Sequence, residues 1–173
     1  WLKAHCTAEF YAANMTVELD NTDKLKVLLA DAKQFNISFE PPDINHGSYR
    51  FEPVSDNVVR YGLCAIKGTG QGAIEAIIAA RDGSGTHEGE GGGPFRSLFD
   101  FAARIDRQRV NKRVVEALIK AGAFDEMKHK RRALVAVHET AVDQYVDIKR
   151  NQAIGQDSLF AGLDDLDGGG NAF

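Results

Sequence analysis

Apolar residues recur at helical spacing in the first part of the chain, where two helices are expected. Residues 1–14 contain no helix breaker, and the apolar side chains expected on one face are Leu2, Cys6 and Phe10. Residues 24–35 carry a second stripe, formed by Leu25, Leu28, Leu29 and Ala32. The segment 20–23 consists of residue types that cap helices, so it predicts where the second helix begins.

Two extended segments then predict a small β element. Residues 36–40 alternate as a short strand, and the prolines at 41–42 end it because proline has no N–H to donate to a sheet. Residues 49–52 and 58–61 flank a polar turn at 55–57, which is the pattern of a β-hairpin.

The remainder of the chain predicts further helices. The first of them ends near Arg81, and the next spans 98–104. A third spans 110–121, with Gly122 as its C-cap, and the last runs from 130 to 152. The fold class expected is therefore mostly α with a small β element (α+β).

The distribution of apolar residues also separates a packed segment from two segments that are expected to be mobile or disordered. Four residues are bunched too closely to be exposed, and we expect most of them to pack between helices: Phe95, Leu98, Phe99 and Phe101. Residues 82–93 lack this apolar character and predict a mobile surface loop. From Gly155 onward the chain is rich in glycine and aspartate, and disorder is expected.

A glycine-rich turn is the most informative motif. Gly68, Gly70 and Gly72 alternate just before an amphipathic run that begins near Ala73. Glycine allows positive φ, which we expect at Gly70, and close approach of another group to the backbone. A helix N-terminus adds free N–H groups and partial positive charge. Together these features predict a binding site for an anion, most simply a phosphate.

Two functions fit this turn. In the first, Gly68-x-Gly70-x-x-Ala73 matches a permissive dinucleotide-binding fingerprint, and the chain would be a nucleotide- or dinucleotide-binding enzyme domain. That fold needs a second parallel strand, which 82–93 cannot form. The other reading is a helix-hairpin-helix, in which the turn offers backbone N–H groups to a DNA phosphate. A second, glycine-free hairpin at 105–111 favours it, because the pair would clamp double-stranded nucleic acid.

Charge is unevenly distributed. The 173-residue chain has a net charge of −4, yet residues 96–132 hold eleven Lys and Arg against five acids, a local net charge of +6. A basic surface of this kind attracts polyanions. Residues 139–173 hold seven acids and two bases. No apolar run is long enough for a membrane span, and no signal peptide is expected. The start at Trp1 indicates a piece of a longer chain.

Metal and redox chemistry are not expected. The five histidines are scattered without ligand spacing, so no metal site is predicted. The two cysteines, Cys6 and Cys64, are far apart and are interpreted as reduced cytosolic thiols.

Specific segments resemble one family, the alpha (polymerase) subunits of bacterial DNA polymerase III, which are C-family replicative polymerases. The resemblance runs from Trp1 to about Phe160 in the order of the family. Its segments are 1–5 with 8–10, 20–24, 41–45, 61–63 with 65–68, 74–78, 110–113 and 118–125.

The resemblance implies a later part of the fingers region (1–62), a tandem helix-hairpin-helix (63–138), and a helix end with a flexible acidic tail (139–173). It implies DNA binding without catalytic residues, because nothing here resembles the metal-binding aspartates of the palm. Mg²⁺ is expected only for the parent polymerase. Partners implied are primer-template DNA, the sliding clamp and other holoenzyme subunits, in the cytoplasm.

The site residues expected fall into two sets. Those for DNA are Lys67, Gly68, Thr69, Gly70, Gln71, Gly72, Arg107, Arg109, Asn111, Lys112 and Arg113. Those for the clamp are Gln156, Asp157, Ser158, Leu159 and Phe160, which resemble the docking pentapeptide of such polymerases. Leu159 and Phe160 would be its apolar anchors, and Asp157 stands where an apolar residue is common.

Overall fold

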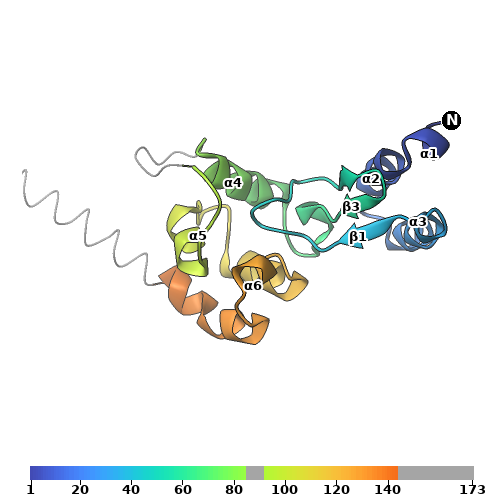
Figure 1. Cartoon of the computed structure of the whole chain (residues 1–173). Helices are drawn as coiled ribbons and strands as arrows, with labels where there is room; N and C mark the ends of the chain where they lie inside the picture. Colours follow the sequence, from blue (N-terminus) through green and yellow to red (C-terminus); the bar gives the residue numbers. More distant parts are fainter. Residues whose placement is uncertain (85–91, 144–173) are drawn as a thin grey trace, which may run out of the picture.

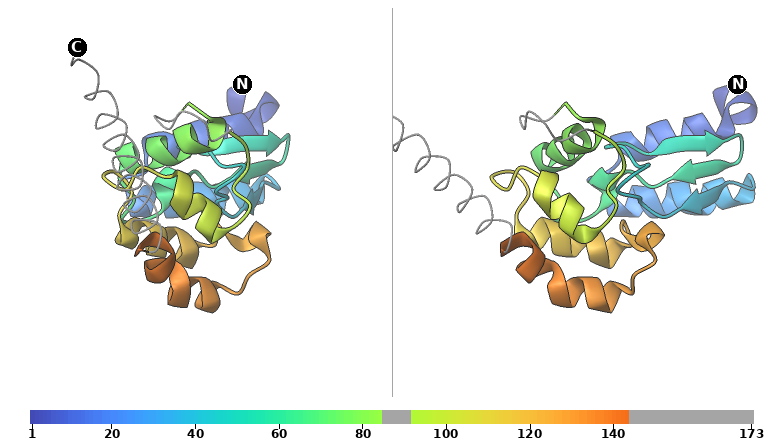
Figure 2. Two further views of the ribbon diagram at one scale, coloured as in Figure 1. Left: turned by 90° about the vertical axis from the view of Figure 1, so that its left-hand side faces the viewer. Right: turned by 60° about the vertical axis from the view of Figure 1, so that its left-hand side comes forward.

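A computed structural model describes residues 1–84 and 92–143 (Figure 1). The described part is mostly helical with one three-stranded mixed sheet, which confirms the fold class predicted from the sequence. Helices α1 to α3 and the three strands occupy one end of the molecule, and α4 to α6 occupy the other (Figures 1 and 2).

The first predicted helix is divided in two. Helix α1 covers Leu2–His5 and α2 covers Thr7–Val17, because Cys6 leaves the helical conformation (φ −134°, ψ 59°). The side chains that α2 buries are Ala8, Tyr11, Ala12 and Met15, and Phe10 of the expected apolar face packs partly buried against the same core. Trp1 and Leu2, which precede the break, are exposed.

Helix α3, Thr22–Gln34, begins where the capping residues predicted. The side chain of Asn21 accepts a hydrogen bond from the backbone N–H of Lys24 at 3.1 Å. Ala32 is buried, and the three leucines of the predicted stripe pack partly buried against the same core. The apolar face of this helix was therefore predicted from its sequence, and its start at Thr22 lies two residues before the predicted one, within the predicted capping segment.

The sheet has the strand order β1-β3-β2. Its strands are β1 Ser38–Glu40, β2 Glu52–Ser55 and β3 Val58–Arg60. The predicted hairpin is confirmed, since β2 and β3 pair antiparallel, with an irregularity between Pro53 and Ser55. Strand β1 pairs parallel to β3, which places β3 in the centre.

The helical end is built from short elements. They are η1 Leu63–Ala65, α4 Gln71–Asp82, α5 Leu98–Arg104, α6 Lys112–Ala121, η2 Asp125–Met127 and a further helical segment at 131–143. Gly122 caps α6 with φ +92°, as predicted. Phe95, Leu98 and Phe101 are buried, but Phe99 is about half exposed, so its predicted burial is wrong.

The buried residues form two clusters. One joins α2 and α3 to the sheet, and the other joins α4, α5 and α6. Segment 43–49 belongs by sequence to the first half, yet Ile44 is part of the second cluster. The backbone N–H of Ile44 donates to the carbonyl of Ala123 at 2.8 Å, and the side chain of Asn45 exchanges two hydrogen bonds with the backbone of Phe95.

Candidate nucleic-acid interface

The glycine turn is closed by Thr69. Its hydroxyl donates to the carbonyl of Ile66 at 2.7 Å, and its backbone N–H donates to the same carbonyl at 3.3 Å. Gly68 has φ +94°, a conformation that residues with a side chain rarely adopt. Gly70 has φ −79° and ψ 155°, so the expectation of positive φ at Gly70 is wrong. The backbone conformation that favours glycine occurs two residues earlier, at Gly68.

Helix α4 begins at this turn without a side-chain cap, because Gly70 is its N-cap. Helices α3, α5 and α6 are capped instead by the side chains of Asn21, Ser97 and Asn111. The N–H groups of Ala73 and Ile74 donate to the Gly70 carbonyl, and the N–H groups before them have no partner within the helix. The end of α4 therefore keeps backbone donors and partial positive charge available to an anion.

The surface around the turn is open. A Cβ atom added at Gly68, Gly70 or Gly72 would meet no atom within 4 Å. Lys67 and Gln71 are exposed, and the Gln71 amide donates to the carboxylate of Glu75 at 2.8 Å. A phosphate group could therefore approach the backbone of this turn without displacing a side chain. The element before the turn is only the 3-10 turn η1, so the hairpin does not join two full α-helices.

The second hairpin joins α5 to α6, as predicted, and Asp106 closes it in place of glycine. The Asp106 carboxylate accepts from the backbone N–H of Gln108 at 2.9 Å, and its carbonyl accepts from the N–H groups of Arg109 and Val110. The side chain of Asn111 then caps α6 by accepting from the N–H of Val114 at 3.0 Å. The side-chain oxygen of Asn111 is thus already engaged as an acceptor.

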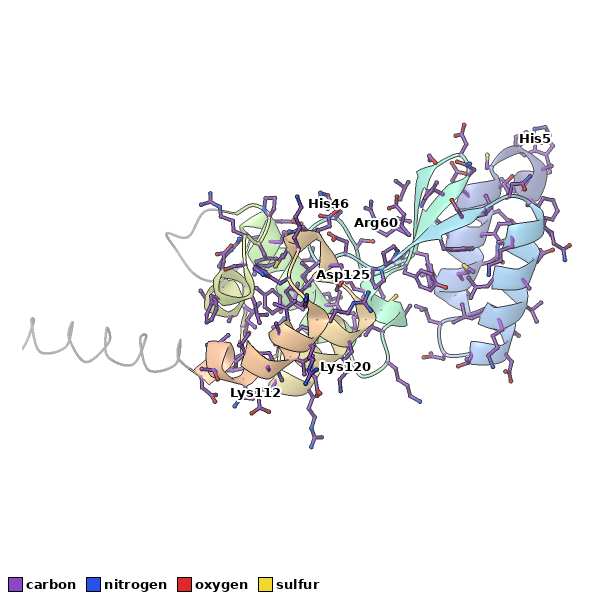
Figure 3. All side chains as sticks on the ribbon, turned by 60° about the horizontal axis from the view of Figure 1, so that its bottom comes forward. His5, His46, Arg60, Lys112, Lys120 and Asp125 are labelled. Carbon is purple, nitrogen blue, oxygen red and sulfur yellow. The ribbon has the colours of Figure 1, made fainter. Side chains whose placement is uncertain are left out.

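Much of the basic block is neutralised locally. Within the described ranges, five of its eleven cations pair with carboxylates: Arg104, Arg109, Lys112, Lys120 and Arg131. Lys112 contacts Asp143 at 2.8 Å. Lys112 and Lys120 both lie at the helical end, far from His5 (Figure 3). Arg113 is exposed and forms no ion pair with any described residue.

Arg104 has a structural role that its sequence context did not reveal. Its guanidinium donates to the carbonyls of Ala80 and Gly93, both at 2.8 Å, and lies 4.6 Å from the ring centre of Phe95. It therefore holds together the two ends of the predicted loop 82–93. Residues 85–91 of that loop lie outside the described residues. Arg107, which is half-buried, is also less available than its charge implies.

The dinucleotide alternative lacks its second strand in the described part of the chain. Helix α4 is followed there by α5, and the strands that the structure describes all precede α4. The residues predicted to dock on the clamp, Gln156 to Phe160, and the expected tail disorder lie outside the described residues.

Sequence reasoning missed two features of the folded chain. The first is a cleft of about 820 Å³ between α2, strand β2 and the glycine turn, which Thr69, Cys64 and Arg50 help to line. Burial raises the pKa of the Cys64 thiol to about 11. The second is a cluster of Asp43, His46 and Glu126. No spacing rule brings residue 126 to residue 43, because tertiary packing alone makes the contact.

Comparison with known proteins gives consistent matches. The family model described as a helix-hairpin-helix motif matches residues 36–134. The chain is 46% identical over 165 residues to DNA polymerase III subunit alpha of Neisseria meningitidis serogroup B, covering 95% of this chain and 14% of that protein. It is 45% identical to the same subunit of Vibrio cholerae over equal shares. For Escherichia coli K12 it is 44% identical over 94% of this chain and 13% of that protein.

The chain thus spans only about one seventh of the length of these relatives. In the ranges that the structure describes, no helix combines the length and apolarity needed to cross a membrane.

Proposed function

We propose that this chain binds the sugar-phosphate backbone of duplex DNA. The chain belongs to the helix-hairpin-helix family and is homologous to a segment of DNA polymerase III subunit alpha. The observation that carries this proposal is the uncapped, glycine-lined N-terminus of α4. An N-terminus of this kind binds phosphate without reading base sequence.

Six residues would form this first contact. Lys67 supplies a mobile charge, Gly68 and Thr69 shape the turn, and Gly70 and Gly72 permit close approach of the phosphate. Gln71 stands on the same exposed turn, held toward Glu75. The phosphate would meet backbone N–H groups first and the lysine second, so binding depends on backbone shape as well as on charge.

The second hairpin would add a further group of cations. Arg113 is the most available cation of this hairpin, and Arg109 shares its charge with Asp106 at 3.7 Å. Lys112 would exchange its partner Asp143 for a phosphate. Asn111 and Arg107 contribute by fixing the start of α6 and the shape of the hairpin.

At the scale of the parent chain, we propose template-directed DNA synthesis by a longer polymerase, of which this segment is a non-catalytic part. Residues 1–62 would complete the fingers, and 63–138 would hold duplex DNA. Gln156, Asp157, Ser158, Leu159 and Phe160 would dock on the sliding clamp, next to other holoenzyme subunits. Mg²⁺ would serve catalytic aspartates elsewhere in the parent. The support is the homology to DNA polymerase III subunit alpha.

The test is fluorescence anisotropy of a labelled, blunt 20-base-pair duplex titrated with the purified chain. We expect affinity to fall steeply between about 50 and 200 mM salt, because phosphate contacts release counterions. Removing one contacting cation by Lys67→Ala or Arg113→Ala should reduce the salt slope by about one unit. Lys24→Ala, at the sheet end and paired with Glu18, is the matched control.

Three results would contradict the proposal. They are an affinity that salt does not change, a strong preference for one base sequence, and competition by a free dinucleotide at low concentration. The last result would instead support the nucleotide-binding alternative.

A further inference from the structure

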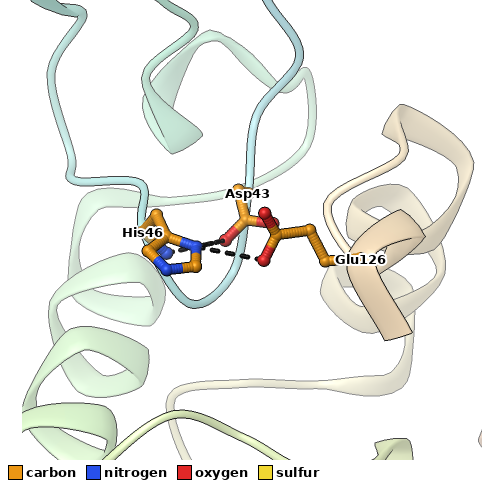
Figure 4. Close-up of side chains that lie close together, drawn as sticks. All are labelled: Asp43, His46 and Glu126. Atoms are coloured by element: carbon orange, nitrogen blue, oxygen red, sulfur yellow. Dashed lines mark hydrogen bonds and ion pairs between the residues drawn. The ribbon is translucent and has the colours of Figure 1, made fainter. Parts of the chain in front are cut away.

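A histidine and two carboxylates from distant parts of the chain lie close together (Figure 4). Asp43 and His46 lie in the segment that follows β1, and Glu126 lies in η2. One ligand-type atom from each residue lies within 4.8 Å of the others. The cluster is separate from the glycine turn and from the second hairpin.

Asp43 is fixed in place before any ligand arrives. Its side chain is 11% exposed, and its Oδ1 atom accepts hydrogen bonds from the backbone N–H groups of Asn45 at 2.8 Å and His46 at 2.6 Å. His46 and Glu126 are more than half exposed, so solvent reaches the cluster from their side. The cluster therefore combines one rigid ligand with two adjustable ones.

The two distances from His46 fit a coordination sphere, and all three ligand atoms lie within 4.8 Å of one another. His46 Nδ1 lies 3.1 Å from Asp43 Oδ1 and 3.1 Å from Glu126 Oε2. Metal–ligand bonds of about 2.0–2.2 Å place neighbouring ligand atoms roughly 2.8–3.6 Å apart for ligand–metal–ligand angles between about 90° and 110°. A single imidazole proton on Nδ1 can be directed at only one of the two carboxylates. A dication would satisfy all three ligands and offset the charge of both carboxylates.

We propose that Asp43, His46 and Glu126 form a binding site for a divalent transition metal of the Zn²⁺ class. An imidazole nitrogen with two carboxylate oxygens favours zinc and its neighbours over calcium or magnesium, which prefer oxygen ligands alone. Three protein ligands and an exposed side leave room for water as a further ligand.

The bound metal would act as a structural tie. It would bridge the segment at 43–46 to η2, next to the backbone hydrogen bond between Ile44 and Ala123. Arg60 of strand β3 donates to the His46 carbonyl at 3.1 Å, so the tie would also reach the sheet. Metal binding to the folded chain alone would raise its thermal stability by mass action.

The experiment uses the untagged chain, freed of metal, and titrates it with Zn²⁺ by calorimetry and with Co²⁺ by visible absorption. We expect one equivalent to bind, with a Co²⁺ absorption band from a nitrogen-containing site and an unfolding midpoint that rises with metal concentration. His46→Gln and Glu126→Gln should each weaken binding by about tenfold or more, because even indirect ligand partners contribute on that scale.

His129→Gln and Glu139→Gln are the matched controls, because both residues are exposed and lie outside the cluster. Circular dichroism without metal establishes that each variant folds. Should Glu126→Gln fold poorly, Glu126→Ala and the Co²⁺ spectrum of His46→Gln repeat the test. Absence of one-equivalent binding up to about 1 mM Zn²⁺, or binding that both cluster variants retain at wild-type strength, would overturn the proposal.

Discussion

Gly68 and Gly70 stand two residues apart in the same turn and yet differ in why glycine is present. At Gly68 the backbone is left-handed, so any side chain is strained there; at Gly70 the backbone is extended and the space around it is open. The sequence predicted an exposed glycine turn before a helix. It could not predict which glycine carries the positive φ, because both occupy turn positions and only the closed turn decides.

The two glycines can be separated by substitution. Gly70→Val should fold normally, since valine accepts the extended conformation, but it should weaken duplex binding by placing a branched side chain at the start of α4. Gly68→Val should cost about 1–3 kcal/mol of stability through backbone strain and also weaken binding. Both effects are measured by chemical denaturation and by DNA anisotropy.

The control for strain is Gly93→Val, because Gly93 also has positive φ with open space around it but lies away from the turn. Gly93→Val should lose stability and keep its DNA affinity. Wild-type affinity in Gly70→Val would remove the proposed role of close backbone approach.

A second residue-scale network fastens α1 to α3. The Asp31 carboxylate accepts hydrogen bonds from Lys3 Nζ at 2.6 Å and from the Tyr11 hydroxyl at 2.7 Å. The hydrogen bond from Lys3 holds the pKa of Asp31 below its ordinary value, and the same bond raises the pKa of Lys3. No pattern in the sequence links residue 31 to residue 3, so this contact could not be predicted.

This network predicts a pH dependence of stability. A carboxyl whose pKa is lowered on folding stabilises the protein above its unfolded pKa, and that contribution is lost as the pH falls through the folded pKa. Asp31→Asn should therefore be less stable than wild type near neutral pH, and the difference should shrink as the pH approaches about 3. Urea midpoints across this range measure it. Asp23→Asn, which removes an exposed ion pair with Lys26, is the matched control.

Among the elements, helix boundaries set by capping residues were predicted best. Helix α5 occupies the predicted residues, and Ser97 caps it by accepting from the N–H of Asp100 at 3.1 Å. Helix α6 begins two residues later than predicted, because Asn111 serves as its cap. The break at Cys6 was not predicted, since no glycine, proline or capping residue marks it. Side-chain caps mark the starts of α5 and α6, whereas no local signal in the sequence marks the break at Cys6.

The cap of α5 can be tested directly. Ser97→Ala should lower the free energy of unfolding by about 1 kcal/mol, because an N–H of the first turn loses its acceptor. Ser97→Asp keeps an acceptor and should restore most of that stability. Chemical denaturation of the three proteins measures the difference. An alanine variant as stable as wild type would mean that water replaces the cap without cost.

At the scale of the whole molecule, the sequence predicted a mostly helical fold with a small sheet, and the resemblance predicted the homology. The sequence predicted which segments contain the candidate site, but it did not predict which of their charged side chains remain available on the surface. The charge count of 96–132 overestimated its basic face, because pairs such as Lys112 with Asp143 form only in the folded chain. The parallel pairing of β1 with β3 was also beyond local patterns, since it joins residues about twenty positions apart.

The proposed partner beyond DNA is tested with a peptide that covers residues 154–162. We expect it to bind the purified sliding clamp with a dissociation constant on the order of 1 μM, because two buried apolar anchors are offset by the cost of ordering a peptide. Replacing both Leu159 and Phe160 with alanine should abolish binding, and Asp157→Leu should strengthen it by removing a carboxylate that is desolvated on docking. A double-alanine peptide that binds like wild type would refute the docking proposal.

The insertion of Ile44 into the helical cluster makes that cluster discontinuous along the chain. Residues 43–45 reach residues 95 and 123 across long loops, so this core cannot close until much of the intervening chain is in place. A protein trimmed to residues 63–138 would lack Ile44. It would also lack Asn45, the hydrogen-bond partner of the backbone N–H and carbonyl groups of Phe95. We expect such a piece to unfold noncooperatively, whereas a piece that starts at residue 36 should retain a sharp transition in differential scanning calorimetry.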